Sequence, residues 1–256
     1  MPSMRQPLSA VLITKNAAGC IEDCLRAAAF CDELLVVDSG SDDGTPERAE
    51  ALGARVIRSH WRGFGLQKQF AVGEARHDWV LCLDADERVS DRLRASIEAA
   101  LAVTPAPACA AYRFARCNRF LGRYLRHGEG YPDWSLRLFD RRQASWSDDT
   151  VHEKVLTGAA VGTLAGDLLH DSAESLAAYL AKQETYTSLA AREALARGRR
   201  ASLPRQWLSP LVRFLKFYLL RLGFLDGVPG LVHILIGCRN SYRKYAKMRA
   251  FQAGRS

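Results

Sequence analysis

Cysteine pairs in metal-binding or disulfide spacing are missing from this sequence of 256 residues. Its seven cysteines are odd in number and none belongs to a CxxC pair, which argues against a disulfide framework and against a zinc site. Most of them lie among apolar residues, where cysteine behaves as a small hydrophobic side chain. The first residues, MPSMRQPLSAVLITKN, also lack the long apolar run of a secretory signal peptide. We therefore expect a protein of the reducing cytoplasm.

Two common phosphate-binding patterns are absent as well. No GK[ST] tripeptide follows a glycine-rich loop, and GxGxxG does not occur, so the sequence has neither a P-loop nor the dinucleotide fingerprint. Long uncharged apolar stretches are equally absent. Residues 210–248 are rich in leucine and phenylalanine, but charges and prolines interrupt every run before it reaches the roughly 18 residues of a membrane-spanning helix. Any bound phosphate needs another kind of partner, and membrane contact is expected to be peripheral.

Acidic residues are scarce at one end of the chain. Residues 197–256 contain 13 Lys or Arg and a single acid, Asp226, so their net charge is +12, whereas residues 1–196 carry −4. This tail predicts an anionic partner, either nucleic acid or a membrane surface. No groove-reading or base-stacking motif accompanies the charge. Lys and Arg alternate instead with Leu, Phe and Tyr, a pattern typical of interfacial helices and also of a packed helical bundle. We expect membrane binding and no nucleic acid.

Residues 8–102 alternate between strand and helix patterns. Nearly continuous apolar strands that alternate with helices indicate an α/β fold, with a parallel sheet covered by helices on both faces. Ligands of such sheets bind at the carboxyl ends of the strands, so residues 14–16, Asp38 and residues 84–86 are expected at one edge. The strands are expected at 8–14, 33–38, 54–58 and 79–84, and the helices at 19–30, 45–53, 65–75 and 90–102, the last with Ser90 as N-cap.

The pattern changes after residue 103. Shorter strands in a mixed arrangement are expected at 110–116, 135–139, 153–158 and 159–164, separated by polar loops. From Ser172 the sequence reads as helical almost to its end, punctuated by Pro204, Pro210 and Pro229.

The stretch WVLCLDADERVS, residues 79–90, brings like charges together at the end of a buried strand. Asp84 and Asp86 are close enough to share one hard cation, and carboxylate oxygens suit Mg²⁺ or Mn²⁺, which also bind phosphate oxygens. The plainer interpretation is a solvated strand end, which stays open for Glu87 and Arg88. Phosphatases of the haloacid-dehalogenase type also end a strand in DxD, but they require Thr or Val where Arg88 stands.

Three motifs carry a family resemblance. AVLITKN, VVDSGSDDGT and LDADE, in this order and spacing, resemble the nucleotide half of family 2 glycosyltransferases of GT-A fold. The later stretches YPDWSLRLF, VHE, LLHDSAESLAAYLAKQETY and GFLDGVPGL resemble a narrower branch, the bacterial lipopolysaccharide-core glucosyltransferases. The resemblance covers nearly the whole chain.

The resemblance implies a role for several residues. Thr14 and Asp38 would contact the uracil or ribose, with Asn16 beside them; Asp84 would touch the nucleotide sugar and Asp86 would bind the metal. It also divides the chain into a GT-A catalytic domain at 1–171, with a nucleotide-sugar half at 1–102 and an acceptor half at 103–171, and a basic amphipathic helical region at 172–256. The QxxRW motif of many members is absent, which argues against processive polymerisation.

The remaining candidates come from the chemistry of sugar transfer. A hydroxyl that attacks an anomeric carbon needs a general base, and SDDTVHE, residues 147–153, supplies Asp148, Asp149 and Glu153, of which Asp149 is favoured. His152 is a candidate partner of the base and His170 a candidate metal ligand, although a structural role is open for both. Arg137 is a candidate partner of the donor phosphates.

The sequence therefore predicts an inverting, metal-dependent glycosyltransferase at the cytoplasmic face of the inner membrane. The resemblance implies UDP-glucose as donor and the lipopolysaccharide inner core, an anionic glycolipid, as acceptor. The alternatives are a family 2 enzyme that acts on a polyprenyl phosphate or a peptide, and a non-catalytic nucleotide-binding protein at the membrane.

Overall fold

The computed structural model describes residues 5–102, 107–149, 153–171 and 175–254. The chain forms two compact units, which are described separately. The α/β unit comprises Met1–Cys117 and Asp133–Asp171, and the helical unit comprises Asn118–Pro132 and Ser172–Ser256. The sequence suggested that residues 118–132 belong to the acceptor half of the catalytic domain, but the structure groups them with the helices because their side chains pack there.

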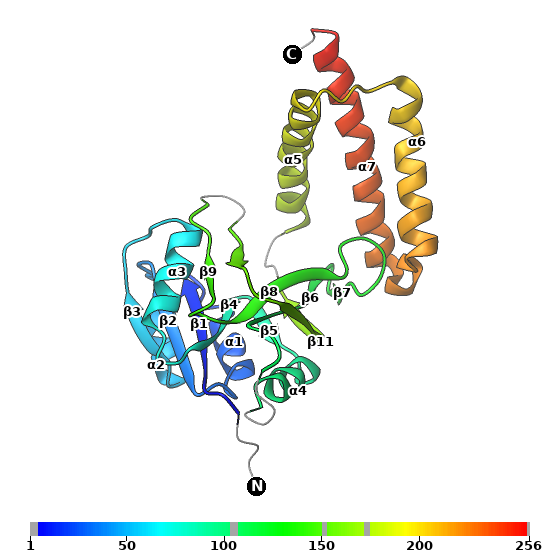
Figure 1. Cartoon of the computed structure of the whole chain (residues 1–256). Coiled ribbons are helices and arrows are strands. Elements are labelled where there is room, and N and C mark those ends of the chain that lie inside the picture. The colour runs from blue at the N-terminus through cyan, green and yellow to red at the C-terminus, as the bar shows by residue number, and fades with distance from the viewer. Residues whose placement is uncertain (1–4, 103–106, 150–152, 172–174, 255–256) are drawn as a thin grey trace. The chain divides into compact units, whose positions relative to one another are not determined.

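The α/β unit is built around one sheet with the strand order β3-β2-β1-β4-β8-β6-β11-β5 (Figure 1). Strands β3 to β4 in this order are parallel, and β8 joins β4 in the antiparallel direction. Its strands are β1 Leu8–Thr14, β2 Glu33–Asp38, β3 Arg55–Arg58, β4 Trp79–Asp84, β5 Glu87–Val89, β6 Ala111–Phe120, β8 Asp133–Asp140 and β11 Val161–His170. Strands β9 Ala144–Trp146 and β10 Val155–Thr157 pair with each other in a separate antiparallel sheet. The larger sheet is therefore parallel in its first half and mixed in its second, as the sequence predicts.

Helices cover both faces of this sheet because successive strand residues point to opposite sides. On β1, Leu8, Ala10 and Leu12 belong to a core cluster that includes side chains of α1, α2 and α4. Val11 points the other way, into a second cluster with α3 and β9. The helices are α1 Ile21–Ala27, α2 Thr45–Ala51, α3 Phe64–Glu74 and α4 Asp91–Ala100. The predicted α/β class with both faces covered is confirmed.

Most of the predicted elements are present close to their predicted bounds. Strands β1, β2 and β4 match residue for residue, and Ser90 is the N-cap of α4, accepting a hydrogen bond from the N–H of Leu93 at 3.3 Å. The sequence did not predict β5 or β9. Both are three residues long, too short for the period-two alternation that identifies a strand.

A buried carboxylate fixes the amino ends of β1, β2 and β3. Glu33 accepts hydrogen bonds from Ser9 Oγ at 2.6 Å, from the N–H of Arg76 at 2.7 Å and from the guanidinium of Arg55 at 2.8 Å. Burial raises the pKa of Glu33, but these hydrogen bonds and the charge of Arg55 outweigh it and leave the pKa lowered. The ionised carboxylate therefore stabilises the sheet.

In its described residues, the helical unit contains three long helices and two short helical segments. Helix α7, Gly227–Gln252, packs against both α5, Leu176–Ala196, and α6, Leu203–Phe214 (Figure 1). A π-helical segment η1, Leu215–Leu220, and a 3₁₀ turn η2, Gly223–Asp226, join α6 to α7, and the unit also contains β7, Arg123–Tyr124. The loop 118–132 is fixed to the helices by hydrogen bonds from the N–H and Nδ1 of His127 to Asp226.

In the described part of the chain, no single helix has the length and apolar composition needed to cross a bilayer. One pair, Leu203–Leu220 with Gly223–Gln252, meets those two criteria only when taken together, and it is bent by 75° at the break.

Candidate functional site

The sheet brings the predicted polar patches to one edge. In the strand register Thr14 lies opposite Asp38 and Ile13 lies opposite Asp84, so the carboxyl ends of β1, β2 and β4 coincide. This is the edge at which α/β sheets bind ligands, and the predicted convergence is confirmed.

Asp38 organises the loop that follows β2, residues 39–44. Its Oδ1 accepts hydrogen bonds from the N–H groups of Gly40 at 3.0 Å and Ser41 at 2.9 Å, and its Oδ2 accepts one from Thr14 Oγ1 at 3.0 Å. Asn16, in the left-handed backbone region at φ 52°, accepts a hydrogen bond from the N–H of Asp42 at 3.1 Å. Thr14, Asn16 and Asp38 therefore fix the shape of this loop, and their direct contact with a nucleotide stays a prediction.

Asp84 lies between two cationic side chains. Arg137 Nη2 is 2.7 Å from Asp84 Oδ2, and Lys68 Nζ is 3.1 Å from Asp84 Oδ1. Burial raises the pKa of Asp84, but the charges of Arg137 and Lys68 outweigh it and hold the pKa well below its usual range. Both cations also lie over the ring of Trp146, at 5.6 and 4.8 Å from its centroid. The protein itself therefore supplies much of the charge balance that the acidic cluster requires.

Glu87 is not part of a solvated strand end, so that interpretation is wrong. Its side chain is fully buried, its Oε2 accepts a hydrogen bond from the N–H of Asp84 at 2.9 Å, and its Oε1 is 3.2 Å from Arg137 Nη2. Burial raises the pKa of Glu87 despite the nearby Arg137. Glu87 is the first residue of β5. Its hydrogen bond to the N–H of Asp84 holds the backbone at the end of β4 in place.

Arg137 has the contacts of a positioning residue. The sequence suggested that it pairs with donor phosphates, but its side chain is buried and its guanidinium binds Asp84 and Glu87. Burial lowers the pKa of Arg137, but the two carboxylates raise it further than burial lowers it. Its position on β8 next to β4 holds it beside Asp84, and its direct contact with a donor phosphate stays a prediction.

Asp86 and His170 lie together, as expected of a metal-ligand pair. His170 Nε2 is 3.2 Å from Asp86 Oδ2, and the side chain of Asp86 is 36% exposed, so a ligand can reach it. Burial lowers the pKa of His170, but the hydrogen bond to Asp86 and its charge outweigh burial and raise the pKa. No group of three potential metal ligands occurs in residues 5–102, 107–149, 153–171 and 175–254. The donor set, one carboxylate and one imidazole, fits Mn²⁺ or Mg²⁺ if phosphate oxygens and water complete the coordination.

The three candidate bases lie in two different environments. Asp148 and Asp149 are exposed, whereas Glu153 Oε1 is 3.0 Å from Lys68 Nζ. A Cβ on Gly65, in the first turn of α3, would lie 2.2 Å from the carbonyl oxygen of Ser147 and 3.1 Å from that of Asp149. The absence of a side chain at Gly65 therefore lets this loop approach α3. His152, the candidate partner of the base, lies outside the described residues.

Lys68 is a residue of this candidate site that sequence reasoning missed. It is buried on α3 and links Asp84 to Glu153. A signal was present, because Lys68 shares a helix face with Gly65 and Val72, and a lysine on the apolar face of a helix is seldom buried without an anionic partner.

Comparison with known proteins identifies the family. The family model described as glycosyl transferase family 2 matches residues 9–162, more than half of the chain. The chain belongs to glycosyltransferase family 2. This glycosyltransferase has the GT-A type of α/β sheet that the resemblance predicts.

Relatives of known sequence extend over the helical unit as well. The lipopolysaccharide core biosynthesis glycosyltransferase LpsC of Rhizobium meliloti (strain 1021) is 27% identical over 94% of this chain and 93% of its own. An uncharacterized glycosyltransferase of Rickettsia bellii (strain RML369-C) is 30% identical over 96% of this chain and 87% of its own. Among solved structures, glucosyl-3-phosphoglycerate synthase from Mycobacterium tuberculosis, crystallised with Mn²⁺, UDP and glucosyl-3-phosphoglycerate, is 25% identical over 44% of each chain, with a TM-score of 0.36. That structural likeness is too partial to support conclusions about the site.

Proposed function

We propose that this glycosyltransferase transfers glucose from UDP-glucose, with inversion, to the inner core of lipopolysaccharide. The observation that carries the proposal is the convergence of the Asp38 loop, Asp84 and the Asp86–His170 pair at one sheet edge. The similarity to LpsC, a glycosyltransferase of lipopolysaccharide core biosynthesis, supports the acceptor class. The choice of UDP-glucose as the donor rests on the sequence motifs alone.

The side chains supply the parts of a single displacement. The acceptor hydroxyl oxygen attacks the anomeric carbon, its proton passes to a carboxylate, and the bond from that carbon to the diphosphate oxygen breaks. Asp149 is our proposed base, with Glu153 and Asp148 as the other candidates. A divalent ion held by Asp86 and His170 would neutralise charge on the departing diphosphate. Lys68, 3.1 Å from Asp84, keeps that carboxylate ionised and fixed for contact with the donor sugar.

A donor panel tests the reaction. The protein is incubated with UDP-glucose and other nucleotide sugars, and release of the nucleoside diphosphate is measured with Mn²⁺, with Mg²⁺ and with a chelator. We expect release from UDP-glucose that stops with the chelator and in Asp86→Asn, while the circular dichroism spectrum stays unchanged. Release that persists in the chelator would disprove the metal-dependent mechanism.

Single substitutions separate the candidate bases. Replacing the true base should lower turnover by about 10² to 10⁴ while donor binding persists, and we expect this of Asp149→Asn. Glu153→Gln should instead weaken donor binding, since it removes a partner of Lys68. Asp148→Asn tests the remaining candidate, which is exposed next to Asp149. Normal turnover in all three variants would assign the base elsewhere.

We also propose that the helical unit holds the enzyme peripherally at the cytoplasmic surface of the inner membrane. Large apolar side chains are exposed along α6, η1 and η2, with Leu220 at 80%, and the basic residues Arg205, Lys216 and Arg221 are exposed beside them. Each cation near an anionic bilayer contributes about 1 kcal/mol, while the apolar side chains enter the headgroup region. The exposed apolar residues here include Trp207, Leu211, Leu215, Leu219, Leu222, Phe224 and Val228.

Vesicle sedimentation tests the membrane proposal. The protein should bind vesicles that contain phosphatidylglycerol, bind phosphatidylcholine vesicles weakly, and dissociate as salt rises. Leu220→Glu should reduce binding, whereas Leu189→Glu, an equivalent change at an exposed leucine of α5, should not. Equal binding to both kinds of vesicle, or to neither, would refute the proposal.

A further inference from the structure

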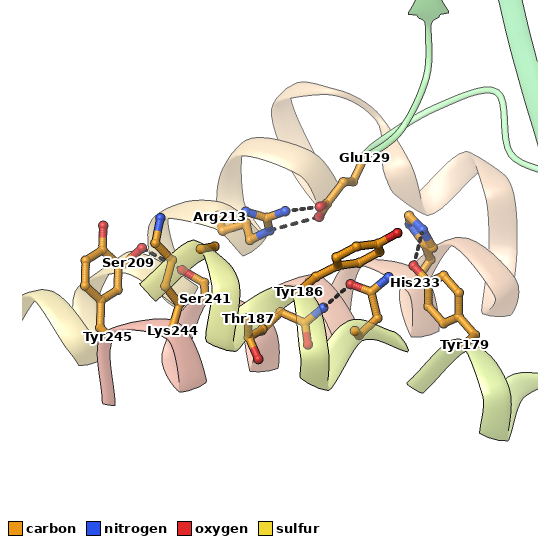
Figure 2. Close-up of a pocket in the computed structure, with 14 residues that line it drawn as sticks. Glu129, Tyr179, Tyr186, Thr187, Ser209, Arg213, His233, Ser241, Lys244 and Tyr245 are labelled. Carbon is orange, nitrogen blue, oxygen red and sulfur yellow. Dashed lines mark hydrogen bonds and ion pairs between the residues drawn. The ribbon is translucent and has the colours of Figure 1, made fainter. Parts of the chain in front are cut away.

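A cavity of about 330 Å³ lies within the helical unit, between α5, α6, α7 and the loop 118–132. Figure 2 shows Lys244 and Tyr245 at one end, Tyr179 and His233 at the other, and Tyr186 between them. Hydroxyl, amide and aromatic side chains predominate in the lining. Groups that both donate and accept hydrogen bonds, combined with aromatic faces, match a ligand that carries many hydroxyl groups on a compact ring.

One wall of this cavity is a partly exposed ion pair, with 35% of the Arg213 side chain and 18% of the Glu129 side chain exposed. The guanidinium of Arg213 binds the carboxylate of Glu129 through two contacts, one of them 3.0 Å from Nε to Oε2 (Figure 2). The pair lies directly against Gly237 of α7, where an added Cβ would be 2.3 Å from Glu129 Oε2. Glycine inside a helix costs about 1 kcal/mol relative to alanine. The space that the ion pair needs explains why a glycine occupies position 237.

The far end of the cavity has an unsatisfied polar atom. His233 Nε2 lies 3.2 Å from the hydroxyl of Tyr179, but within the described residues its buried Nδ1 has no hydrogen-bond partner. Burial and the charge of Arg213 lower the pKa of His233, so the ring is neutral. A buried polar atom of this kind is normally satisfied by water or a ligand.

A second cavity, of about 420 Å³, adjoins the first and shares Lys244 and Tyr245 with it. Arg199, Arg200 and Arg205 complete its charged lining, and no carboxylate lies among the described residues that line it. In the part of the chain that the structure describes, none of the four cations takes part in an ion pair. Four cations around one space favour an anionic group, and phosphate or carboxylate are the groups that Arg binds best.

We propose that the two cavities form one binding site for an anionic saccharide. The sugar ring occupies the first cavity, beside Tyr186 and His233, and a phosphate or carboxylate on that ring occupies the second, between Lys244 and the three arginines. This site rests on the proposed function, since it would hold a charged sugar of the glycolipid acceptor. Its lining residues all belong to the helical unit, and it shares none of them with the proposed donor site.

Calorimetric titration of the full chain tests the site with simple probes. We expect glucose 6-phosphate to bind with a Kd on the order of 0.1–1 mM and at least tenfold more tightly than glucose or inorganic phosphate. Lys244→Gln should weaken glucose 6-phosphate and phosphate by about tenfold, because a charge-assisted contact is lost. Tyr186→Ala should weaken only the probes that contain a sugar. Lys182→Gln, the same change at an exposed position of α5, is the matched control.

Three outcomes would overturn the inference. Inorganic phosphate that binds as tightly as glucose 6-phosphate would leave an anion site without a sugar subsite. If Lys182→Gln weakened the binding of glucose 6-phosphate as much as Lys244→Gln does, the effect would reflect the net charge of the protein and not a specific site. Loss of binding to phosphatidylglycerol vesicles in Lys244→Gln, without binding of glucose 6-phosphate, would assign the cations to the lipid surface.

The outcome is independent of catalysis. Failure of transfer with every nucleotide sugar would refute the proposed function, whereas the titrations would still report on the saccharide site. If both proposals hold, Lys244→Gln should raise KM for the acceptor and leave hydrolysis of the donor unchanged.

Discussion

Replacing Arg137 by methionine is the most direct test of the charge balance at the end of β4. The substitution keeps an unbranched apolar chain on β8 but removes the cation that lies 2.7 Å from Asp84 and 3.2 Å from Glu87. Glu87 has no exposed surface, so water cannot replace the lost partner without opening the turn. We therefore expect a loss of stability beyond that of an ordinary surface substitution.

The magnitude follows from the distances. At an effective dielectric constant of about 20, each contact corresponds to roughly 5–6 kcal/mol of gross attraction. The desolvation of Arg137 offsets much of this, and the remaining partners, Lys68 for Asp84 and Arg116 at 3.7 Å for Glu87, keep part of the balance. Removing one member of a buried pair costs about 3–5 kcal/mol, and we expect the variant to lose that much at neutral pH.

The stability lost in Arg137→Met should depend on pH. The pKa of Glu87 is already raised by burial and rises further without Arg137. A group whose pKa is raised on folding contributes stability below its unfolded pKa, about 4.3, that is lost as pH rises through the folded pKa. The difference between Arg137→Met and the wild type should therefore shrink as pH falls, because a proton on Glu87 removes the unpaired buried charge.

Urea unfolding followed by tryptophan fluorescence measures both effects. Adding Glu87→Gln to Arg137→Met should recover part of the lost stability, because the unpaired buried charge is gone. Arg94→Met is the control, since Arg94 pairs with Glu98 on the exposed face of α4 and should cost under about 1 kcal/mol. A loss below about 1 kcal/mol for Arg137→Met, or the same loss at pH 5 and pH 7, would contradict the electrostatic explanation.

Three further predictions concern other parts of the α/β unit. Gly65→Ala should lower turnover about 10²-fold with donor binding retained, because the new methyl group displaces the loop of Asp149 and small displacements of a catalytic group are costly; unchanged steady-state kinetics would mean that the loop is not catalytic. Glu33→Gln should cost about 2 kcal/mol at pH 7, and because the pKa of Glu33 is lowered on folding the cost in urea titrations should decline as pH falls below the unfolded pKa of about 4.3 and through the lower folded pKa. Ser90→Ala should cost about 1 kcal/mol through loss of the N-cap of α4, whereas no change in thermal unfolding would show that the cap contributes nothing.

The first half of the sheet was predictable because its pattern is local. Each of the strands β1, β2 and β4 is a short apolar run bounded by polar residues, and the parallel arrangement follows from the helices between them. Strand β5 escaped prediction because it comprises only Glu87, Arg88 and Val89, and two charged residues in three resemble a loop. Strand β5 is ordered because it pairs with β11, about 80 residues later. A contact between such distant segments leaves no trace in the local sequence pattern.

The same limit applies to the site. The residues at the ends of β1, β2 and β4 were predictable, because strand ends of a parallel sheet share an edge. The counterions were not, since Lys68 comes from α3 and Arg137 from the antiparallel strand β8, and their approach to Asp84 depends on tertiary packing. The sequence presented an excess of negative charge, and only the folded chain shows which of the acids is already neutralised.

That distribution of charge suggests different tasks for the two aspartates of LDADE. Both oxygens of Asp84 are occupied by protein cations, and a further cation there would meet Lys68 and Arg137 at close range. The side chain of Asp86 contacts His170, which can lose its proton, and its carboxylate remains partly exposed. A divalent ion is repelled at the first position and attracted at the second. We therefore propose that the ion binds on the Asp86 side, while Asp84, fixed and ionised, faces the donor sugar.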